Sequence, residues 1–300
     1  MSRTATTTAD VYPSRIENQP RITPRQDPVI WRRTRTAAPC SETEIAHYEE
    51  NGFLILPDLL DASEVAALRD AADTARRTVA TTLDPATVVI EPESQAVRSI
   101  FAIHRQIEPI GALMRDPRLT ELARFILDDD VYIHQSRLNY KPGFIGRDFW
   151  WHSDFETWHI EDGMPRMRAL SVSLMLTDNL VSNGPLMLIN GSHRHYVACV
   201  GETPAEHFKA SLRKQEYGVP DHDSITQLAE RGIRAAVARA GSAVVFDCNV
   251  LHGSAGNITP FPRSNLFFVY NALSNRCVAP FSGQPPRPEH IATRDHVTPI

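Results

Sequence analysis

Two histidines and one aspartate in this 300-residue chain have the types and spacing needed to hold a metal ion. His152 and Asp154 are two residues apart, and in an extended backbone such side chains point to the same face. His252 ends the apolar stretch 241–253, far along the chain. Two imidazoles and a carboxylate on one face of a metal leave positions open for other ligands, as in non-heme Fe(II) oxygenases. The pattern therefore predicts an iron site.

The surroundings of these residues strengthen the metal hypothesis. Aromatic side chains crowd residues 149–158, so we expect Asp154 in a partly dry cleft, where a cation offsets the desolvation of its carboxylate. A His-x-Asp pair alone is a weak signal, and zinc also accepts two histidines and a carboxylate, so a zinc hydrolase stays open. The nearby Glu156 and Asp162 are expected to orient a histidine ring or to cap a helix.

Arg263 has a use in one version of this chemistry. It lies eleven residues after His252, where the next strand begins. If 2-oxoglutarate chelates the iron, its distal carboxylate needs a fixed cation, and a guanidinium donates two parallel hydrogen bonds to it. Zinc hydrolysis would leave Arg263 and Lys141 without a role. The alternative for Arg263 is a surface arginine that follows the turn at 260–262.

Periodicity and capping signals predict the elements that must position these residues. Ser41-Glu-Thr-Glu44 has the spacing of a capping box, and Asn51-Gly52 ends the helix that it begins. Residues 53–57 form a predicted strand, and Asp61-Ala-Ser-Glu64 begins a second helix that runs to about Arg77. Further helices are predicted at 107–114 and 117–127, and strands at 130–141, 168–176, 185–190, 233–237, 242–250 and 265–273.

Helices followed by short strands with turn signals between them predict an α+β, mainly β fold. We expect a double-stranded β-helix, a jelly-roll, cupin-like barrel buttressed by helices. Alternation from Val131 to Lys141 places the odd-numbered residues on one face, which faces water or lines a polar pocket. Residues 41–300 are predicted to form a single domain with a helical insertion around 203–232. Residues 1–40 form an arm that is flexible or wraps the surface.

The composition limits the partners and the compartment. A net charge of −5 and a pI near 6.2 give no reason to expect nucleic acid or an anionic membrane as a partner. No apolar stretch approaches the roughly 20 residues of a membrane span, and no signal core follows the first charges. The four cysteines are scattered, as free thiols are in a reducing compartment, so we expect a cytoplasmic protein.

The stretch from Trp151 to Ala169 resembles the signature of the ectoine hydroxylases, within the phytanoyl-CoA dioxygenase-like branch of the Fe(II)/2-oxoglutarate enzymes. Residues 1–40 and the tail after Arg276 lie outside the similar motifs. Asp154 is present, whereas a small residue in its place would indicate a halogenase. The other similar segments are 51–53, 135–143, 183–186, 191–193, 252–254 and Arg263.

This resemblance implies an activity and a set of site residues. The activity is hydroxylation of ectoine to 5-hydroxyectoine, with 2-oxoglutarate and O₂ becoming succinate and CO₂. His152, Asp154 and His252 would hold the iron. The implied 2-oxoglutarate residues are Asn139, Lys141, Ser254 and Arg263, and those near the substrate are Gln135, Trp158, Ser173 and Phe246.

The proposed substrate also agrees with the residue types. Ectoine is a cyclic amidine carboxylate, and an aromatic face such as that of Trp158 attracts an amidinium by about 0.5–2 kcal/mol. Trp158 and Phe246 could equally be core residues. Two other functions stay open: the same chemistry on another small zwitterionic or acyl substrate, and a solute-binding barrel without catalysis. A homodimer also stays open.

Overall fold

The computed structural model describes residues 9–31, 38–91, 95–205 and 217–300. Both N-terminal helices begin at the predicted capping boxes. In α1 (Glu42–Asn51) the Ser41 side chain accepts from the Glu44 backbone N–H, and the helix ends at Gly52 with φ 84°. Helix α2 (Ala62–Thr82) begins at the Asp61 cap and extends past the predicted end at Arg77.

Helix α5 (Pro117–Leu127) has the predicted bounds. Asp116 caps it by accepting from the Arg118 backbone N–H, and Pro117 occupies the first turn, where its missing N–H has no consequence. The short α3, which precedes α4, was not predicted. The remaining helical segments are α3 (Ile103–Gln106), α4 (Glu108–Leu113), α6 (Asp154–Thr157), the π-helical turn η2 (Trp158–Asp162), α8 (His222–Leu228) and the 3₁₀ turns η1 (Pro85–Thr87), η3 (Ser192–Arg194), η4 (Ala229–Arg231) and η5 (Leu273–Asn275).

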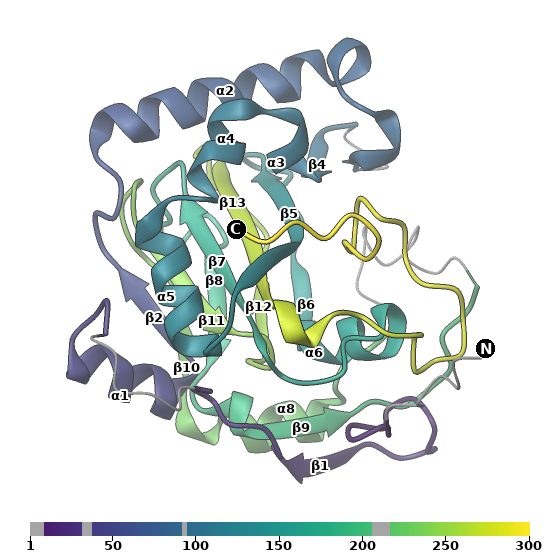
Figure 1. Ribbon diagram of the computed structural model, residues 1–300. Coiled ribbons are helices and arrows are strands. Elements are labelled where there is room, and N and C mark those ends of the chain that lie inside the picture. The colour runs from purple at the N-terminus through teal and green to yellow at the C-terminus, as the bar shows by residue number, and fades with distance from the viewer. Residues whose placement is uncertain (1–8, 32–37, 92–94, 206–216) are drawn as a thin grey trace.

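Two antiparallel sheets form the centre of the molecule (Figure 1). The large sheet has the order β2-β11-β7-β13-β5-β4-β3 and the small sheet β10-β8-β12-β6. Strands β1 and β9 pair separately. The strands are β1 (Arg21–Pro24), β2 (Phe53–Leu56), β3 (Val88–Ile90), β4 (Val97–Phe101), β5 (Val131–Lys141), β6 (Phe149–His152), β7 (Ala169–Met175), β8 (Leu186–Ile189), β9 (His195–Ala198), β10 (Ile233–Ala235), β11 (Ala243–Asp247), β12 (His252–Ser254) and β13 (Arg263–Ala272).

Alternation along the strands separates two apolar layers. On β11, Val245 packs with helices α2, α4 and α5 against the outer face of the large sheet. Its neighbours Val244 and Phe246 pack with Leu188 of the small sheet, so the two sheets face each other. Burial of each such side chain contributes about 1.5–3 kcal/mol. The predicted jelly-roll class is confirmed, although in the described part of the chain the two sheets do not close into one barrel.

Strand β5 contains one extra residue, His134, at a β-bulge. Two consecutive residues of β13 pair with Ile133 and Gln135, which leaves His134 without a partner in the ladder. The single face predicted for residues 131–141 is therefore wrong. Ile133 packs into the helix-side core, whereas the odd-numbered residues from 137 onward line a cavity between the sheets.

Both terminal segments pack against the core. In the N-terminal segment, Tyr12 is buried and β1 pairs with β9. In the tail, the Ile291 carbonyl accepts a hydrogen bond from the Gln135 side chain at 2.9 Å. The predicted insertion at 203–232 is helical at α8 and η4, while its residues 206–216 lie outside the described residues. Within the described ranges, no helix has the length and apolar character that a membrane crossing requires.

Candidate metal centre and cosubstrate pocket

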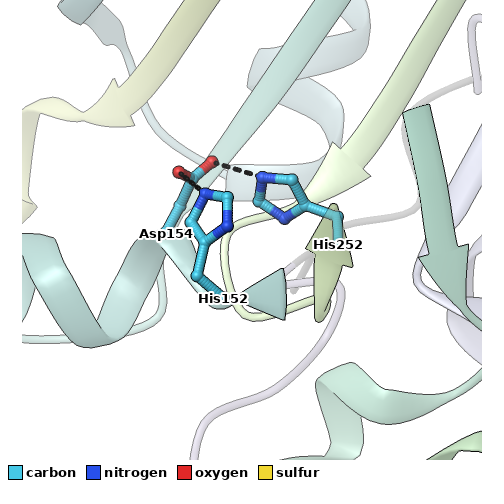
Figure 2. Close-up of side chains that lie close together, drawn as sticks. All are labelled: His152, Asp154 and His252. Atoms are coloured by element: carbon cyan, nitrogen blue, oxygen red, sulfur yellow. Dashed lines mark ion pairs between the residues drawn. The ribbon is translucent and has the colours of Figure 1, made fainter. Parts of the chain in front are cut away.

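His152 and His252 are neighbours because their strands pair. Strand β12 runs antiparallel to β6, and the two histidines lie opposite each other in the register. Strand β6 ends at His152 and α6 begins at Asp154, so only Ser153 is extended between them, with φ −102° and ψ 128°. This single extended residue turns Asp154 toward the histidines (Figure 2). One ligand atom from each of the three lies within 4.8 Å of the others.

The backbone fixes the tautomer of both imidazoles. Nδ1 of His152 lies 2.8 Å from the Trp150 carbonyl oxygen, and Nδ1 of His252 lies 2.9 Å from that of Val250. A carbonyl oxygen can only accept, so each Nδ1 carries the proton and each Nε2 presents a lone pair. Backbone carbonyls therefore orient the rings, and not the neighbouring carboxylates that the sequence indicated.

The electrostatics of the three residues suit a cation. Burial and the nearby His252 lower the pKa of His152 to about 3, and burial also lowers the pKa of His252, so both rings are neutral. Their Nε2 atoms lie 3.7 and 3.8 Å from the Asp154 carboxylate oxygens, too far for hydrogen bonds. Nε2 of His252 is buried without a hydrogen-bond partner among the described residues. Two lone pairs and a carboxylate converge, which fits a divalent metal.

A cavity between the sheets reaches His152 and His252. All four residues predicted to bind 2-oxoglutarate line it: Asn139, Lys141, Ser254 and Arg263. The Lys141 amine donates from Nζ to the Ser254 hydroxyl at 2.9 Å. The remaining lining residues are Glu91, Arg98, Ser99, Phe101, Arg137, Tyr140, Pro142, Gly146, Arg147, Phe149, Leu186, Gly253 and Phe267.

The cavity carries more positive than negative charge. Burial and the neighbouring Arg263 lower the pKa of Lys141 to about 6, and burial and Arg98 lower that of Arg263 to about 10. The Nε atoms of Arg137 and Arg263 are buried without hydrogen-bond partners in the described ranges. A buried donor without a partner costs about 1–3 kcal/mol, so this arrangement suits an anionic ligand with several acceptor oxygens.

In the described part of the chain, the four predicted substrate residues are not among those that line this cavity. The Trp158 ring is buried and lies 5.4 Å from the His134 ring, centroid to centroid. The Phe246 ring lies 5.0 Å from His252. Ser173 accepts a hydrogen bond from the Asn265 side chain, and the Gln135 amide donates to the C-terminal tail.

Three arginines that line the cavity, Arg98, Arg137 and Arg147, were given no role from the sequence. Arg98 stands on β4, a strand that was not predicted, and pairs with Glu91. A weak alternation along residues 97–101 could have predicted this strand. There Val97, Ser99 and Phe101 alternate with polar and apolar neighbours. Arg137 was placed on the correct face of its strand, but it was given no role.

Comparisons with known proteins agree with this geometry. The family model described as phytanoyl-CoA dioxygenase (PhyH) matches residues 48–265. The ectoine dioxygenase of Sphingopyxis alaskensis is 54% identical over 286 residues, which are 95% of this chain and 93% of that protein. A crystal structure of EctD from S. alaskensis with 2-oxoglutarate and 5-hydroxyectoine aligns with a TM-score of 0.86 at 49% identity over 95% of both chains. One with bound Fe gives 0.87 at 48% identity over 97% of both.

Proposed function

Because the chain belongs to the phytanoyl-CoA dioxygenase family, and within it to the ectoine dioxygenases, we propose that it hydroxylates ectoine. The product is 5-hydroxyectoine, and the enzyme is a non-heme Fe(II)/2-oxoglutarate-dependent dioxygenase. Iron with 2-oxoglutarate and O₂ supplies the oxidising chemistry, and 2-oxoglutarate leaves as succinate and CO₂. The protein must hold these groups and place one substrate C–H bond close to them.

His152, Asp154 and His252 hold the iron in this proposal. Their support is the convergence of two neutral Nε2 lone pairs and one carboxylate within 4.8 Å of one another. Each histidine is fixed by a backbone carbonyl and both strands are paired, so the ligands need little rearrangement when the ion binds.

Asn139, Lys141, Ser254 and Arg263 bind 2-oxoglutarate. Arg263 supplies the guanidinium for the distal carboxylate, and its Nη1 is held by the Gly184 carbonyl at 2.5 Å. We add Arg137 to this set, because its unpartnered Nε lies in the same cavity. The cavity is lined by more cationic than anionic side chains. This surplus of positive charge offsets the two negative charges of 2-oxoglutarate.

In this proposal the substrate is surrounded by four side chains, those of Gln135, Trp158, Ser173 and Phe246. Trp158 offers an aromatic face to the amidinium, and its ring lies in a buried cluster and meets the His134 ring edge-on at 5.4 Å. Ser173 and Phe246 lie on adjacent strands β7 and β11 and point from the large sheet toward the small one. The competing substrates, another zwitterion or an acyl compound, would meet the same residues.

The unpartnered Nε2 of His252, opposite His152 and Asp154, is the observation that carries this function. The test is to incubate anaerobic protein with Fe(II), 2-oxoglutarate and ectoine, admit air, and measure products by mass spectrometry. We expect one oxygen atom added to ectoine and about one succinate for each hydroxylated product.

The same assay separates the alternatives. Succinate without hydroxylated ectoine would keep the oxygenase and reject the substrate. Absence of succinate together with activity of the zinc-loaded protein on an ester or amide would support a hydrolase. Ectoine binding that Asp154→Ala leaves unchanged, without any turnover, would support a solute-binding protein.

We also infer a cytoplasmic location. All four cysteines are free thiols, as expected where reductants are abundant, and 2-oxoglutarate and Fe(II) are supplied there. The homodimer that the resemblance left open stays a prediction, which the mass of the protein in solution would test.

A further inference from the structure

The N-terminal segment places one arginine beneath the helix that carries the aspartate ligand. Arg15 donates from Nε and Nη2 to the two carboxylate oxygens of Glu156, at 2.9 and 2.7 Å. Its Nη1 donates to Glu161 at 2.8 Å. Glu156 lies in α6 two residues after Asp154, and Glu161 lies in η2, so one guanidinium ties both turns together.

This contact is sealed from solvent. The side chain of Arg15 is 3% exposed and that of Glu156 is 1% exposed. Gly218 covers the pair closely: a Cβ on Gly218 would lie 2.2 Å from the Glu156 carboxylate and 2.6 Å from Nη2 of Arg15. Ser14 adds a hydrogen bond to Glu156 at 2.7 Å. A carboxylate so enclosed has no water to replace a lost partner.

The backbone is strained to bring Arg15 there. Arg15 has φ 58°, in the left-handed region that residues other than glycine rarely adopt. Its backbone N–H donates to the Cys199 carbonyl of the β9 end at 2.8 Å, which holds this conformation. Strain of this kind persists only where surrounding contacts outweigh it.

The same segment makes one further contact with α6 and one with η2. The Tyr12 ring meets the Phe155 ring edge-on at 5.2 Å, and Asp10 lies 2.8 Å from Nε2 of His159. Helix α6 is a single turn of 4 residues, too short to hold its own orientation. Its position, and that of Asp154 at its first residue, therefore depends on these external contacts.

We propose that Arg15 is a positioning residue for the metal centre: its guanidinium fixes α6 and η2 through Glu156 and Glu161. It thereby sets the direction of the Asp154 carboxylate and the place of Trp158. This inference rests on the proposed function to the extent that Asp154 is a metal ligand. It gives the N-terminal segment, which contains none of the predicted site residues, a role in the metal centre.

The test replaces Arg15 by lysine and compares it with Arg21→Lys. Lysine keeps the charge and the reach, but one ammonium cannot hold both oxygens of Glu156 and Glu161 together. Arg21 is the matched control, because it lies in the same segment and pairs at the surface with Glu17, both about half exposed. Anaerobic titration with Co(II), followed by its visible absorption, gives the metal Kd. Turnover gives the ratio of succinate to hydroxylated product.

For Arg15→Lys we expect a metal Kd about tenfold weaker and at least two succinates per hydroxylated product, against about one in the wild type. Arg21→Lys should stay within twofold of the wild type in both measurements. A folded Arg15→Lys protein with the wild-type Kd and ratio would overturn the inference. Wild-type protein that binds no metal would instead reject the proposed function.

A second variant tests the same contact if Arg15→Lys does not fold. Glu156→Gln keeps the size of the side chain and one acceptor oxygen, and removes the charge that Arg15 binds. For Glu156→Gln we expect a weaker metal Kd and a higher ratio of succinate to hydroxylated product, each changed by about a third as much as in Arg15→Lys. Its circular dichroism spectrum should match that of the wild type. If Glu156→Gln and Arg15→Lys are combined, the loss in metal affinity should be smaller than the product of the single losses. Independent, multiplicative effects would contradict a shared contact.

Discussion

Two groups of buried polar residues in this molecule differ in how completely their polar atoms are matched by hydrogen-bond or ion-pair partners. The metal centre and its cavity contain buried nitrogen atoms of His252, Arg137 and Arg263 that have no hydrogen-bond partner in the part of the chain that the structure describes. The buried ionic network behind them consists of Arg15, His134, Glu156, Glu161, Asp162 and Arg287. Every acid of this network faces a cation within 3.2 Å.

Burial alone therefore does not distinguish a binding site from a structural network. Asp154 and Asp162 are both buried aspartates in the same helical segment. Asp162 accepts two hydrogen bonds from Arg287, whereas among the described residues Asp154 receives only a long one, 3.3 Å, from Ser171. The poorly satisfied group is the one that a ligand completes, and substitutions in the two groups should separate function from stability.

The largest effect is expected for Asp154→Asn. Loss of the anionic ligand should lower hydroxylation about 1000-fold or more, because the metal is no longer held. The unfolding free energy of the metal-free protein should fall little, since no lysine or arginine of the described residues lies within ion-pair distance of this carboxylate. Product mass and urea unfolding measure the two effects. Asp70→Asn, exposed on α2, is the control. A metal-free Asp154→Asn protein that is clearly less stable would break the comparison.

Asp162→Asn should have the opposite pattern in stability. Burial raises the pKa of Asp162 and Arg287 lowers it more, to about 2 from an ordinary 3.8. This difference corresponds to about 2 kcal/mol of folding free energy. The contribution is present above pH 3.8 and is lost as the pH falls through about 2. Urea unfolding of wild type and variant should differ at pH 6 and converge toward pH 2. A difference that stayed constant to pH 2 would contradict the assigned cause.

Arg263→Lys should raise the KM for 2-oxoglutarate about tenfold. A lysine keeps the charge but not the two parallel hydrogen bonds to a carboxylate. The KM for ectoine should change less than threefold, because the proposed substrate residues lie on other elements than β13, which carries Arg263. Steady-state kinetics with each compound varied in turn measures both constants. Arg234→Lys, exposed on β10, should change neither. Equal changes in both constants would mean that Arg263 supports the whole site.

Binding of 2-oxoglutarate should also take up a proton, the smallest of these effects. In the cavity, burial and Arg263 lower the pKa of Lys141 to about 6, so the amine is mostly neutral at pH 7.5. A carboxylate beside it favours the charged form and raises that pKa, so binding takes up most of one proton. Calorimetry in buffers of different ionisation enthalpy measures this number. Lys141→Met should abolish the uptake, and uptake that persists in it would assign the proton elsewhere.

Local rules predicted the elements that local contacts decide. The capping boxes at Ser41 and Asp61 and the proline start of α5 all appear as predicted, because each depends on residues within one turn. The short strands β4, β6 and β12 were not predicted, because they contain polar residues, whereas β2 and β8 are of similar length but wholly apolar. Long-range pairing, which no local pattern records, makes them strands.

Some residues of the site could be predicted from the sequence, and others could not. His152, Asp154 and His252 have spacing and residue types that chemistry requires, and the structure brings them together. Arg15 gave no signal, because its partners Glu156 and Glu161 lie 141 and 146 residues away in the chain. The mutual position of substrate residues such as Trp158 depends on side-chain packing, which neither spacing nor polarity determines.

The extra residue in β5 adds a side chain without changing the pocket. If His134 were deleted, Ile133 and Gln135 would be consecutive and would keep their partners on β13, so Arg137, Asn139 and Lys141 would still face the cavity. The deletion would remove the imidazole that meets the Trp158 ring edge-on and contacts the Asp162 carboxylate. A relative without this residue should therefore keep its affinity for the cosubstrate and lose the ring that supports Trp158.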